Sequence, residues 1–446
     1  MNNSKSFYKS LITLVIPIAI QNLITSAVNS ADVFMLGFVG QAELSAVSLA
    51  NQVQFLISGI FFGITSGIIM LCSQYWGKKD TDTIQKVMGI AFKISFVICL
   101  IFTMVAFFFP GTIMRIYTND AELIEIGMGY LRVISFSYVL LSFSQVYLSV
   151  LRSLERPHIS TIISSVALIT NVILNAVFIF GLFGAPKLGV IGVAIATTLA
   201  RILEVILCVI DLLTNKVFSF NWKLAMQWDK VLFMDYLKYS IPALVNDISW
   251  TLAFSTYSII MGHLNADVVA ANSVVSTVRN LLTVICYGIS AGGTVLLGIT
   301  IGEGRLEDAK KDASRLLKAS LLSGVVTAVL LFLVKPIVFA CFILTEQAYE
   351  YLNFMLNIST YYIIGQIFNT VMITGIFRAG GDSRFGMICD TINMWLVSVP
   401  LGFLAAFVLD LPPMAVYFVL CLDEFWKIPF VWKHYKSYKW LKNITR

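Results

Sequence analysis

Charged residues are scarce in this chain, and their scarcity excludes most soluble folds. Only 13% of the 446 residues are Asp, Glu, Lys or Arg, while 58% are hydrophobic and the mean hydropathy is +0.85. A soluble globular protein has about 25% charged and about 45–50% apolar residues. Because the deficit extends over the whole chain, it cannot come from a single anchor. The composition therefore predicts an integral membrane protein.

The sequence also lacks the motifs of common catalytic and metal-binding sites. It has no P-loop and no HExxH pair, and none of its seven cysteines forms a CxxC pair. The letters GxSxG occur at Gly288–Gly292, but inside an apolar run rather than at a strand-to-helix turn. We therefore expect no enzyme, no ATP-driven pump, no cofactor and no metal beyond a possible Na⁺. The basic residues flank apolar runs, so we expect no nucleic-acid partner.

Long apolar runs recur from end to end, each near the roughly 20 residues that a helix needs to cross a bilayer. In lipid, backbone polar groups are satisfied within helices or closed barrels, and the alternation of a barrel is absent. The sequence predicts an all-α integral membrane protein with twelve transmembrane helices, near residues 11–36, 44–73, 88–110, 131–151, 160–183, 188–212, 236–261, 268–299, 316–340, 353–376, 385–408 and 413–432.

Basic residues in the connections gather on one side of these spans. Of the 31 Lys and Arg residues, only Arg115, Lys187 and Lys335 fall in connections on the other side. An excess of Lys and Arg marks cytoplasmic loops. We therefore expect a multi-pass protein of the cell membrane, in contact with its lipid, with both termini in the cytoplasm and an even number of spans.

The chain repeats itself with an offset of 225 residues, which aligns Pro17 with Pro242 and Gly77 with Gly302. Each half holds six expected spans, so the halves enter the membrane the same way up. We expect two six-helix lobes related by a pseudo-twofold axis along the membrane normal. The expected parts are an N-terminal lobe at 1–212, a cytoplasmic linker at 213–235, a C-terminal lobe at 236–432 and a basic cytoplasmic tail at 433–446. Such a plan indicates a transporter that works by alternating access, without identifying the cargo.

Asp32 is the first candidate for cation coupling. An ionisable group inside a span costs roughly 2.5–3.5 kcal/mol on insertion scales, so it usually serves a function. A carboxylate there is an acceptor for a proton or for Na⁺. The alternative is a hydrated Asp at the membrane edge. Pro17, in the same span, removes a backbone hydrogen bond and allows a conformational hinge, although a proline that starts a helix is an equal alternative.

Five further polar residues are candidates for cation coupling. Asn171 and Asn175 are four residues apart and so share a helix face, where their amide oxygens can ligate a cation or bond another helix. Thr197 is a weaker candidate of the same kind. Asp247 and Asp390 have no opposite charge within one helical turn, which favours a role in coupling or cargo contact.

Other charged residues have structural interpretations. Arg201 with Glu204, and Glu424 with Lys427, are spaced as paired ions that lower each other's insertion cost. Arg378 and Asp382 flank a pair of glycines, so we expect them to form a cytoplasmic turn with a basic anchor.

The chain resembles the multidrug and toxic compound extrusion (MATE) family across nearly its whole length. The carrying stretches, each weak alone, are Ile16-Pro17 with Asp32–Gly37, Tyr75–Gly77, Met114–Asp120, Asn171–Asn175, Phe377–Asp382 and Asp390–Pro400. The resemblance implies a V-shaped pair of lobes that exports drug-like, often cationic compounds against inward proton or sodium flow. It also implies that Asp32 is the coupling acid, that Pro17 bends when Asp32 is protonated, and that Asn171 belongs to a cation site.

The sequence departs from the family pattern at Asn175, which stands where well-described members have Asp, and at Trp250, which stands where one branch has Glu, with Asp247 three residues earlier. The second departure makes coupling through Asp247 and Asp390 in the C-terminal lobe an alternative to coupling through Asp32. The main hypothesis is a monomeric antiporter that exports small amphipathic substrates. The alternative is a flippase for a lipid-linked saccharide, which shares the two-lobe plan but commonly has more spans and a more basic cavity.

Overall fold

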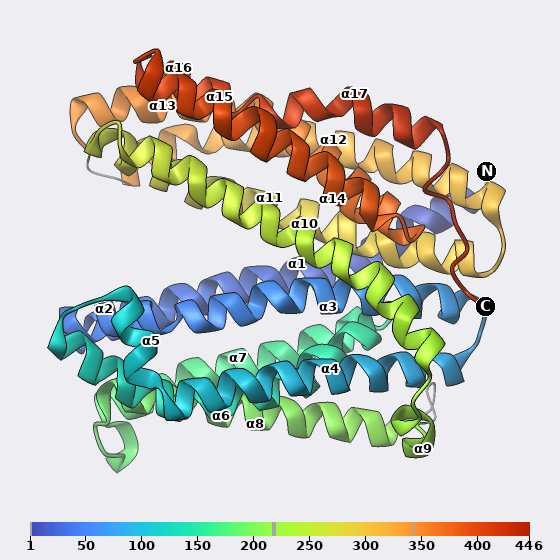
Figure 1. Ribbon diagram of the computed structural model, residues 1–446, viewed down its shortest axis with the longest axis horizontal. Helices are drawn as coiled ribbons and strands as arrows, with labels where there is room; N and C mark the ends of the chain where they lie inside the picture. Colours follow the sequence, from blue (N-terminus) through green and yellow to red (C-terminus); the bar gives the residue numbers. More distant parts are fainter. Residues whose placement is uncertain (1, 216–219, 342–343) are drawn as a thin grey trace. The chain divides into compact units, whose positions relative to one another are not determined.

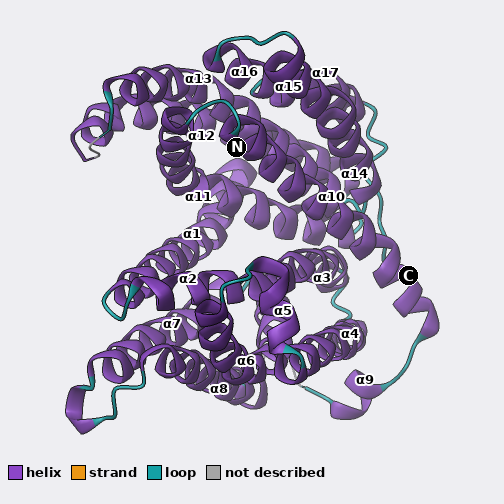
Figure 2. Ribbon diagram, turned by 60° about the vertical axis from the view of Figure 1, so that its left-hand side comes forward, coloured by secondary structure: helices purple, strands orange, loops and turns teal. Residues whose placement is uncertain are grey.

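The computed structural model describes residues 2–215, 220–341 and 344–446, and Lys216 of the expected linker lies outside this range. Within it the chain forms helices joined by short connections, and no strand (Figures 1 and 2). This agrees with the expectation that the backbone satisfies its own polar groups inside each apolar segment.

Short polar residues and prolines decide where several helices begin. The side chain of Asp80 accepts a hydrogen bond from the backbone N–H of Thr83, and Asn265 caps the N–H of Val268 in the same way. Such caps satisfy backbone donors that have no partner in the first turn. Other helices begin at a proline, which lacks the N–H and already has a helical φ.

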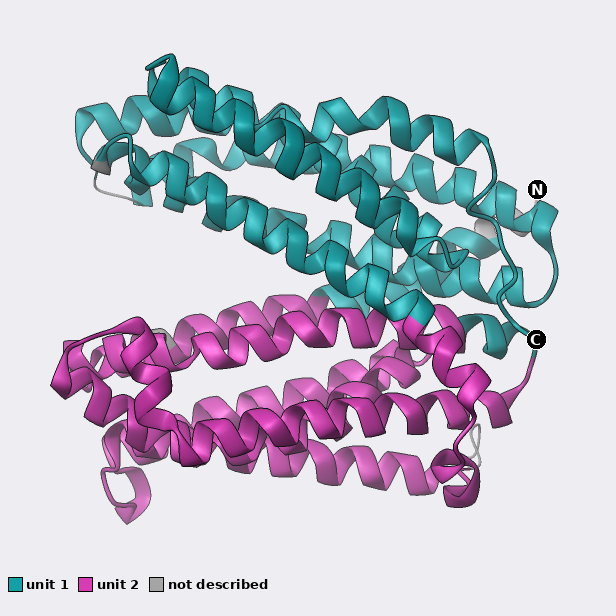
Figure 3. Ribbon diagram, in the orientation of Figure 1, with its two compact units in different colours: residues 1–19, 73–78, 238–446 teal, residues 20–72, 79–237 magenta. Residues whose placement is uncertain are grey.

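The chain forms two compact units (Figure 3). The first-half unit comprises residues 20–72 and 79–237, and the second-half unit comprises residues 1–19, 73–78 and 238–446. The helices that lie wholly or mainly in the first-half unit are α1 (Asn2–Gly37, from residue 20), α2 (Gln41–Ala50), α3 (Gln52–Gly77, to residue 72), α4 (Thr81–Phe108), α5 (Pro110–Tyr117), α6 (Ala121–Ser153), α7 (Pro157–Phe180), the short η1 (Leu182–Gly184), α8 (Gly189–Thr214) and α9 (Trp222–Met226).

The second-half unit contains the remaining helices, three of which are π-helical segments. They are α10 (Lys230–Gly262, from residue 238), α11 (Ala266–Gly302), α12 (Leu306–Cys341), α13 (Glu346–Thr370), η2 (Val371–Phe377), α14 (Ser383–Thr391), η3 (Ile392–Ser398), α15 (Val399–Phe403), η4 (Leu404–Val408), α16 (Pro413–Leu420) and α17 (Asp423–Lys436). The π-helical segments are η2, η3 and η4. Its core includes apolar side chains from α10, α11, α12, α13, η2, α16 and α17, together with the start of α1.

The units do not follow the expected lobe boundaries at two segments. Residues 1–19 belong to the second-half unit because α1 packs closely there, with Val15 against Gly288 and Gly292. Residues 73–78 belong to it because the end of α3 crosses the end of α11. The expected linker contributes α9, whose Ala225 lies against Gly89 of α4. The expected tail is ordered in part, since Trp440 is fully buried.

The crossing of α3 and α11 is made by repeat-related residues. A Cβ added to Gly77 would overlap the carbonyl oxygen of Ile299, and one added to Gly302 would overlap the carbonyl oxygen of Gln74. The offset of 225 relates Gly77 to Gly302 and also Gln74 to Ile299. This reciprocal contact is what a local twofold relation between the two segments produces, and it requires glycine at both positions.

Ten helices among the described residues are long and apolar enough to cross a membrane, two fewer than the expected twelve. The expected span at 236–261 lies in α10, which is long but carries polar residues such as Asn246 and Asp247 in its middle. The expected span at 413–432 is divided between α16 and α17, so neither piece is long enough. The two-lobe arrangement of twelve spans therefore stays a prediction, whereas the all-helical, multi-pass character is confirmed.

Candidate functional site

The first-half unit contains a polar cavity of about 280 Å³. Its polar lining includes Asp32 from α1, Gln54 from α3, Tyr130 from α6, Asn171 from α7 and Thr197 from α8. Each of these helices carries its polar residue among apolar ones, so the polar side chains meet inside the unit while the apolar ones pack or face lipid. Three of the predicted coupling residues therefore line one cavity.

Asp32 is held in this cavity by the predicted asparagines. The amide of Asn175 donates to Asp32 Oδ1 at 2.7 Å and lies 3.3 Å from Asn171 Oδ1, while Asn171 Nδ2 donates to Thr197 at 3.1 Å. Asn175 is fully buried, and its own Oδ1 has no hydrogen-bond partner. A buried acceptor without a donor is costly. The arrangement therefore presents a carboxylate and an unpaired amide oxygen that suit a bound cation.

The lining of this cavity also includes one basic side chain. Arg201 lines the cavity and forms an ion pair with Glu204 at 2.7 Å, at the spacing that the sequence suggested. Arg201 is paired with the carboxylate of buried Glu204, so the two charges neutralise each other. Asp32 forms its hydrogen bond to a neutral amide instead, which leaves its negative charge available.

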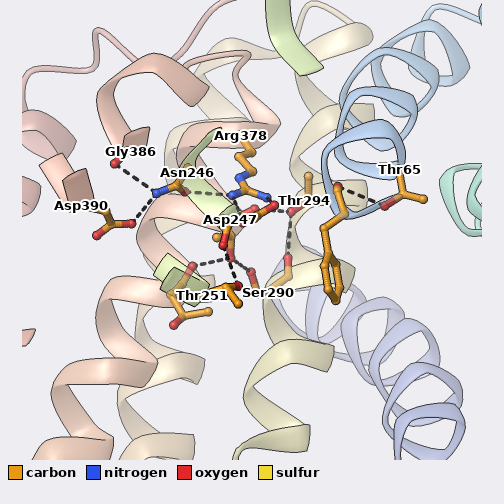
Figure 4. Close-up of polar contacts among 12 residues, drawn as sticks. Thr65, Asn246, Asp247, Thr251, Ser290, Thr294, Arg378, Gly386 and Asp390 are labelled. Carbon is orange, nitrogen blue, oxygen red and sulfur yellow. Dashed lines mark hydrogen bonds and ion pairs between the residues drawn. The ribbon is translucent and has the colours of Figure 1, made fainter. Parts of the chain in front are cut away.

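The second-half unit has a different polar site, built around Asn246 of α10. Arg378 donates to Asp247 Oδ1 at 2.7 Å and to Asn246 Oδ1 at 3.0 Å, and Asn246 Nδ2 donates to Asp390 Oδ2 at 2.8 Å. Figure 4 shows Asn246 between Arg378 and Asp390. Sequence reasoning found no opposite charge within one helical turn of Asp247 or Asp390. Their partners come from other helices, which sequence spacing does not reveal.

The network continues from Asp390 to the last helix. Lys427 lies 2.9 Å from Asp390 Oδ1 and 3.1 Å from Glu424 Oε2, and Asn369 Nδ2 donates to Glu424 Oε2 at 2.7 Å. Lys427 is 3% exposed and Glu424 is 2% exposed. The pair suggested by the sequence is therefore a triad, in which one buried ammonium serves two carboxylates.

Pro17 lies inside α1, which runs without a break from Asn2 to Gly37. The alternative of a proline that starts a helix is therefore wrong. A proline in a helix interior removes one backbone hydrogen bond and favours bending. A hinge at Pro17 is compatible with this position and stays a prediction.

The turn at residues 378–382 has the expected glycines, but its arginine points inward. Arg378 is 7% exposed and paired with Asp247, so it is not a simple anchor at the membrane surface. Asp382 lies 2.9 Å from His434 and 3.8 Å from Lys442. Partial burial acts to raise the pKa of Asp382, but the hydrogen bond with His434 and the charge of Lys442 outweigh it and lower the pKa below 3.8.

Sequence reasoning missed several residues of these sites. In the first-half unit, the hydroxyl of Tyr130 donates to Asn51 at 3.0 Å beside the cavity. In the second-half unit it missed Asn246 as a bridge, and it assigned no role to Asp423. The repeat offers one signal, because the offset of 225 relates Asp32 to Tyr257, whose hydroxyl lies 3.5 Å from Asp423.

Known proteins resemble this chain over almost its whole length. The family model MatE matches residues 17–177 and 242–404. The uncharacterized transporter YisQ of Bacillus subtilis is 23% identical, over 97% of this chain and 95% of the relative. A probable multidrug resistance protein NorM of Listeria innocua is 25% identical, over 89% of this chain and 87% of the relative. A structure described as MATE in the bent conformation has a TM-score of 0.87 at 18% identity, covering 97% of this chain and 96% of that one.

Proposed function

Because the chain belongs to the MatE family, we propose that it is a secondary active antiporter that exports small amphipathic, often cationic compounds in exchange for protons or Na⁺. Relatives named as multidrug resistance proteins support drug-like compounds as the cargo class. Further parts of the proposal are alternating access, a monomer, the cell membrane as location, and both termini in the cytoplasm.

The observation that carries the proposal is the Asp32 cavity. Asp32 is an acid in an apolar helix, hydrogen-bonded to a neutral amide, next to the unpaired oxygen of buried Asn175. An acid without a cationic partner inside a membrane segment is energetically unfavourable unless a transported cation binds to it. We assign Asp32 as the coupling residue, with Asn171, Asn175 and Thr197 as its supporting ligands.

Antiport requires that cation and cargo act on the same conformational equilibrium. A ligand shifts an equilibrium only by its differential affinity for the two states. In this proposal, a cation on Asp32 neutralises its charge and favours one arrangement of α1, which Pro17 allows to bend. Cargo that favours the other arrangement is then released as the cation binds.

The test is efflux of ethidium from cells that express the chain, driven in turn by an imposed proton gradient and an imposed sodium gradient. We expect efflux with at least one ion, and none from Asp32→Asn at equal expression. Efflux by Asp32→Asn equal to the unchanged protein would remove Asp32 from the coupling site. No efflux with either ion from well-expressed protein would favour the flippase for a lipid-linked saccharide.

A further inference from the structure

A second acid, Asp423, is buried without a cation of its own in the second-half unit. It is fully buried at the first position of α17, and its Oδ1 has no hydrogen-bond partner. Its Oδ2 faces the hydroxyl of Tyr257 at 3.5 Å, a distance at which a hydrogen bond is weak. Two backbone carbonyl groups nearby already accept hydrogen bonds. Asn393 donates to the Asp423 carbonyl, and Asn369 donates to the Glu424 carbonyl.

The bases around Asp423 are committed to other partners. Lys427 is bonded to Asp390 and Glu424, and Arg378 is bonded to Asp247. The remaining base, Arg279 of α11, lies over the rings of Tyr362 at 5.1 Å and Phe254 at 5.6 Å. The titratable groups that face Asp423 from the elements around it are Tyr257 of α10, Arg279 of α11, Tyr362 of α13, Asp390 of α14, Cys421, and Glu424 and Lys427 of α17.

The charges of this cluster do not balance. Its acids are Asp247, Asp390, Asp423 and Glu424, and its bases are Arg279, Arg378 and Lys427. One negative charge is therefore in excess when every group is ionised. An ionised carboxylate buried without a cationic partner costs far more than a neutral one, so we infer that the excess charge is neutralised by a bound ligand. Of the four acids, only Asp423 forms no ion pair, and its carboxylate is met by the backbone N–H of Glu424 and, at 3.5 Å, by the hydroxyl of Tyr257.

The local backbone also marks this cluster. The π-helical segments η2 and η3 pack against α17, and η3 supplies Asn393. π-helical turns are rare, and they occur most often at functional sites.

We propose that Asp423 is a proton-binding site of the second-half unit, separate from the Asp32 cavity, in which one proton neutralises the excess charge of the Asp390–Lys427–Glu424 triad and its neighbours. The proton is the ligand because a neutral carboxyl needs no further oxygen ligands, whereas Na⁺ requires several around one point. The proposal does not rest on the antiport function, since the charge imbalance exists whatever the cargo.

The experiment is infrared difference spectroscopy of the full-length protein in lipid nanodiscs, which resolves the C=O stretch of an un-ionised carboxylic acid from carboxylates. Spectra at neutral pH are compared for the unchanged protein, Asp423→Asn, Asp32→Asn and Glu307→Gln. Asn has the shape of a neutral Asp, and Glu307 is 78% exposed and serves as the control. We expect one carboxylic acid band that is lost only in Asp423→Asn. A band of equal size in Asp423→Asn would overturn the proposal.

Two further arms keep the assignment open to refutation. Tyr257→Phe removes only the hydroxyl near Oδ2 and should move the same band to higher frequency, whereas an unchanged frequency would contradict the assignment even if Asp423→Asn does not fold. Each sample is also measured in choline chloride and in sodium chloride at equal ionic strength. The band should be the same in both salts, and its loss in sodium chloride would replace the proton site by a sodium site. None of these results depends on transport, so they stand apart from the efflux test.

Discussion

The two halves of the repeat place their buried acids in opposite electrostatic settings. In the first-half unit, Asp32 lines an open cavity and bonds to the neutral amide of Asn175. In the second-half unit, Asp247 and Asp390 are each paired with a base from another helix. In the proposed function, the first arrangement keeps a charge available for a mobile cation, whereas the ion pairs of the second join residues of different helices.

Positions that the repeat relates carry different side chains in the two halves, and this explains the difference. The offset of 225 relates Asp32 to Tyr257 and Gln54 to Arg279. One half has an acid and a neutral amide at these positions, and the other has a phenol and a base. The two halves of the repeat therefore hold a polar cavity lined by an acid in one unit and a network of ion pairs in the other. The comparison teaches that fold symmetry does not imply functional symmetry.

The largest expected difference between the units is in transport. Asp32→Asn should abolish gradient-driven efflux without changing the thermal unfolding midpoint much, because the acid has no ion pair to lose. Asp390→Asn should mainly destabilise the protein, by about 1.5–3 kcal/mol, because it removes a hydrogen bond to a charged group. Efflux and the thermal unfolding midpoint are measured for both variants. If both variants lose efflux equally and keep the stability of the unchanged protein, the two acids do not differ in role.

Removal of the shared base should have the largest effect on stability. Lys427→Met leaves Asp390 and Glu424 buried without their ammonium, which should cost about 3–5 kcal/mol. The double variant Lys427→Met with Asp390→Asn should recover part of this cost. The measurement is the thermal unfolding midpoint in detergent, with Lys335→Met, which removes only an exposed hydrogen bond to Asn357, as control. A Lys427→Met midpoint equal to that of the control would mean that the triad is not a structural unit.

Alanine substitutions at the crossing of α3 and α11 test whether the two copies of the repeat are structurally equivalent at their closest backbone contact. Gly77→Ala and Gly302→Ala should each destabilise by about 1–3 kcal/mol, because each added Cβ meets a backbone carbonyl. The repeat-related pair Gly37→Ala and Gly262→Ala has open space at both positions and should stay within about 0.5 kcal/mol. If Gly77→Ala and Gly302→Ala destabilise the protein by clearly different amounts, the two positions are not energetically equivalent despite their local twofold relation.

The smallest effect should come from Asp382, whose charge serves the turn after η2. Its pKa is lowered in the folded protein, so its contribution to stability is present above the ordinary value of 3.8 and is lost as the pH falls through the folded value. Asp382→Asn should therefore be less stable than the unchanged protein at pH 7, and the difference should vanish as the pH falls below the pKa of Asp382 in the folded protein. Unfolding midpoints across this range measure it, and a difference independent of pH would remove the charge from the explanation.

The cavity residues show how far sequence reasoning reaches. Asp32, Asn171 and Thr197 stood out because polar groups in apolar segments are costly, and the structure places them around one cavity. Tyr130 and Asn51 did not stand out, because a tyrosine or a single amide at a helix end has many ordinary roles. Asp247 and Asp390 were read as unpaired, since the search for partners extended only along their own helices.

The helical, multi-pass character, the internal repeat and the acid in the first span could be predicted from the sequence, because these follow from local composition and from spacing along the chain. Which acid pairs with which base could not, because it depends on how the helices pack. Arg378 and Asp247 are 131 residues apart, and Lys427 and Asp390 are 37 apart. Partners at such separations are chosen by the packing of several helices at once, and that choice leaves one acid with a cavity and another with no base.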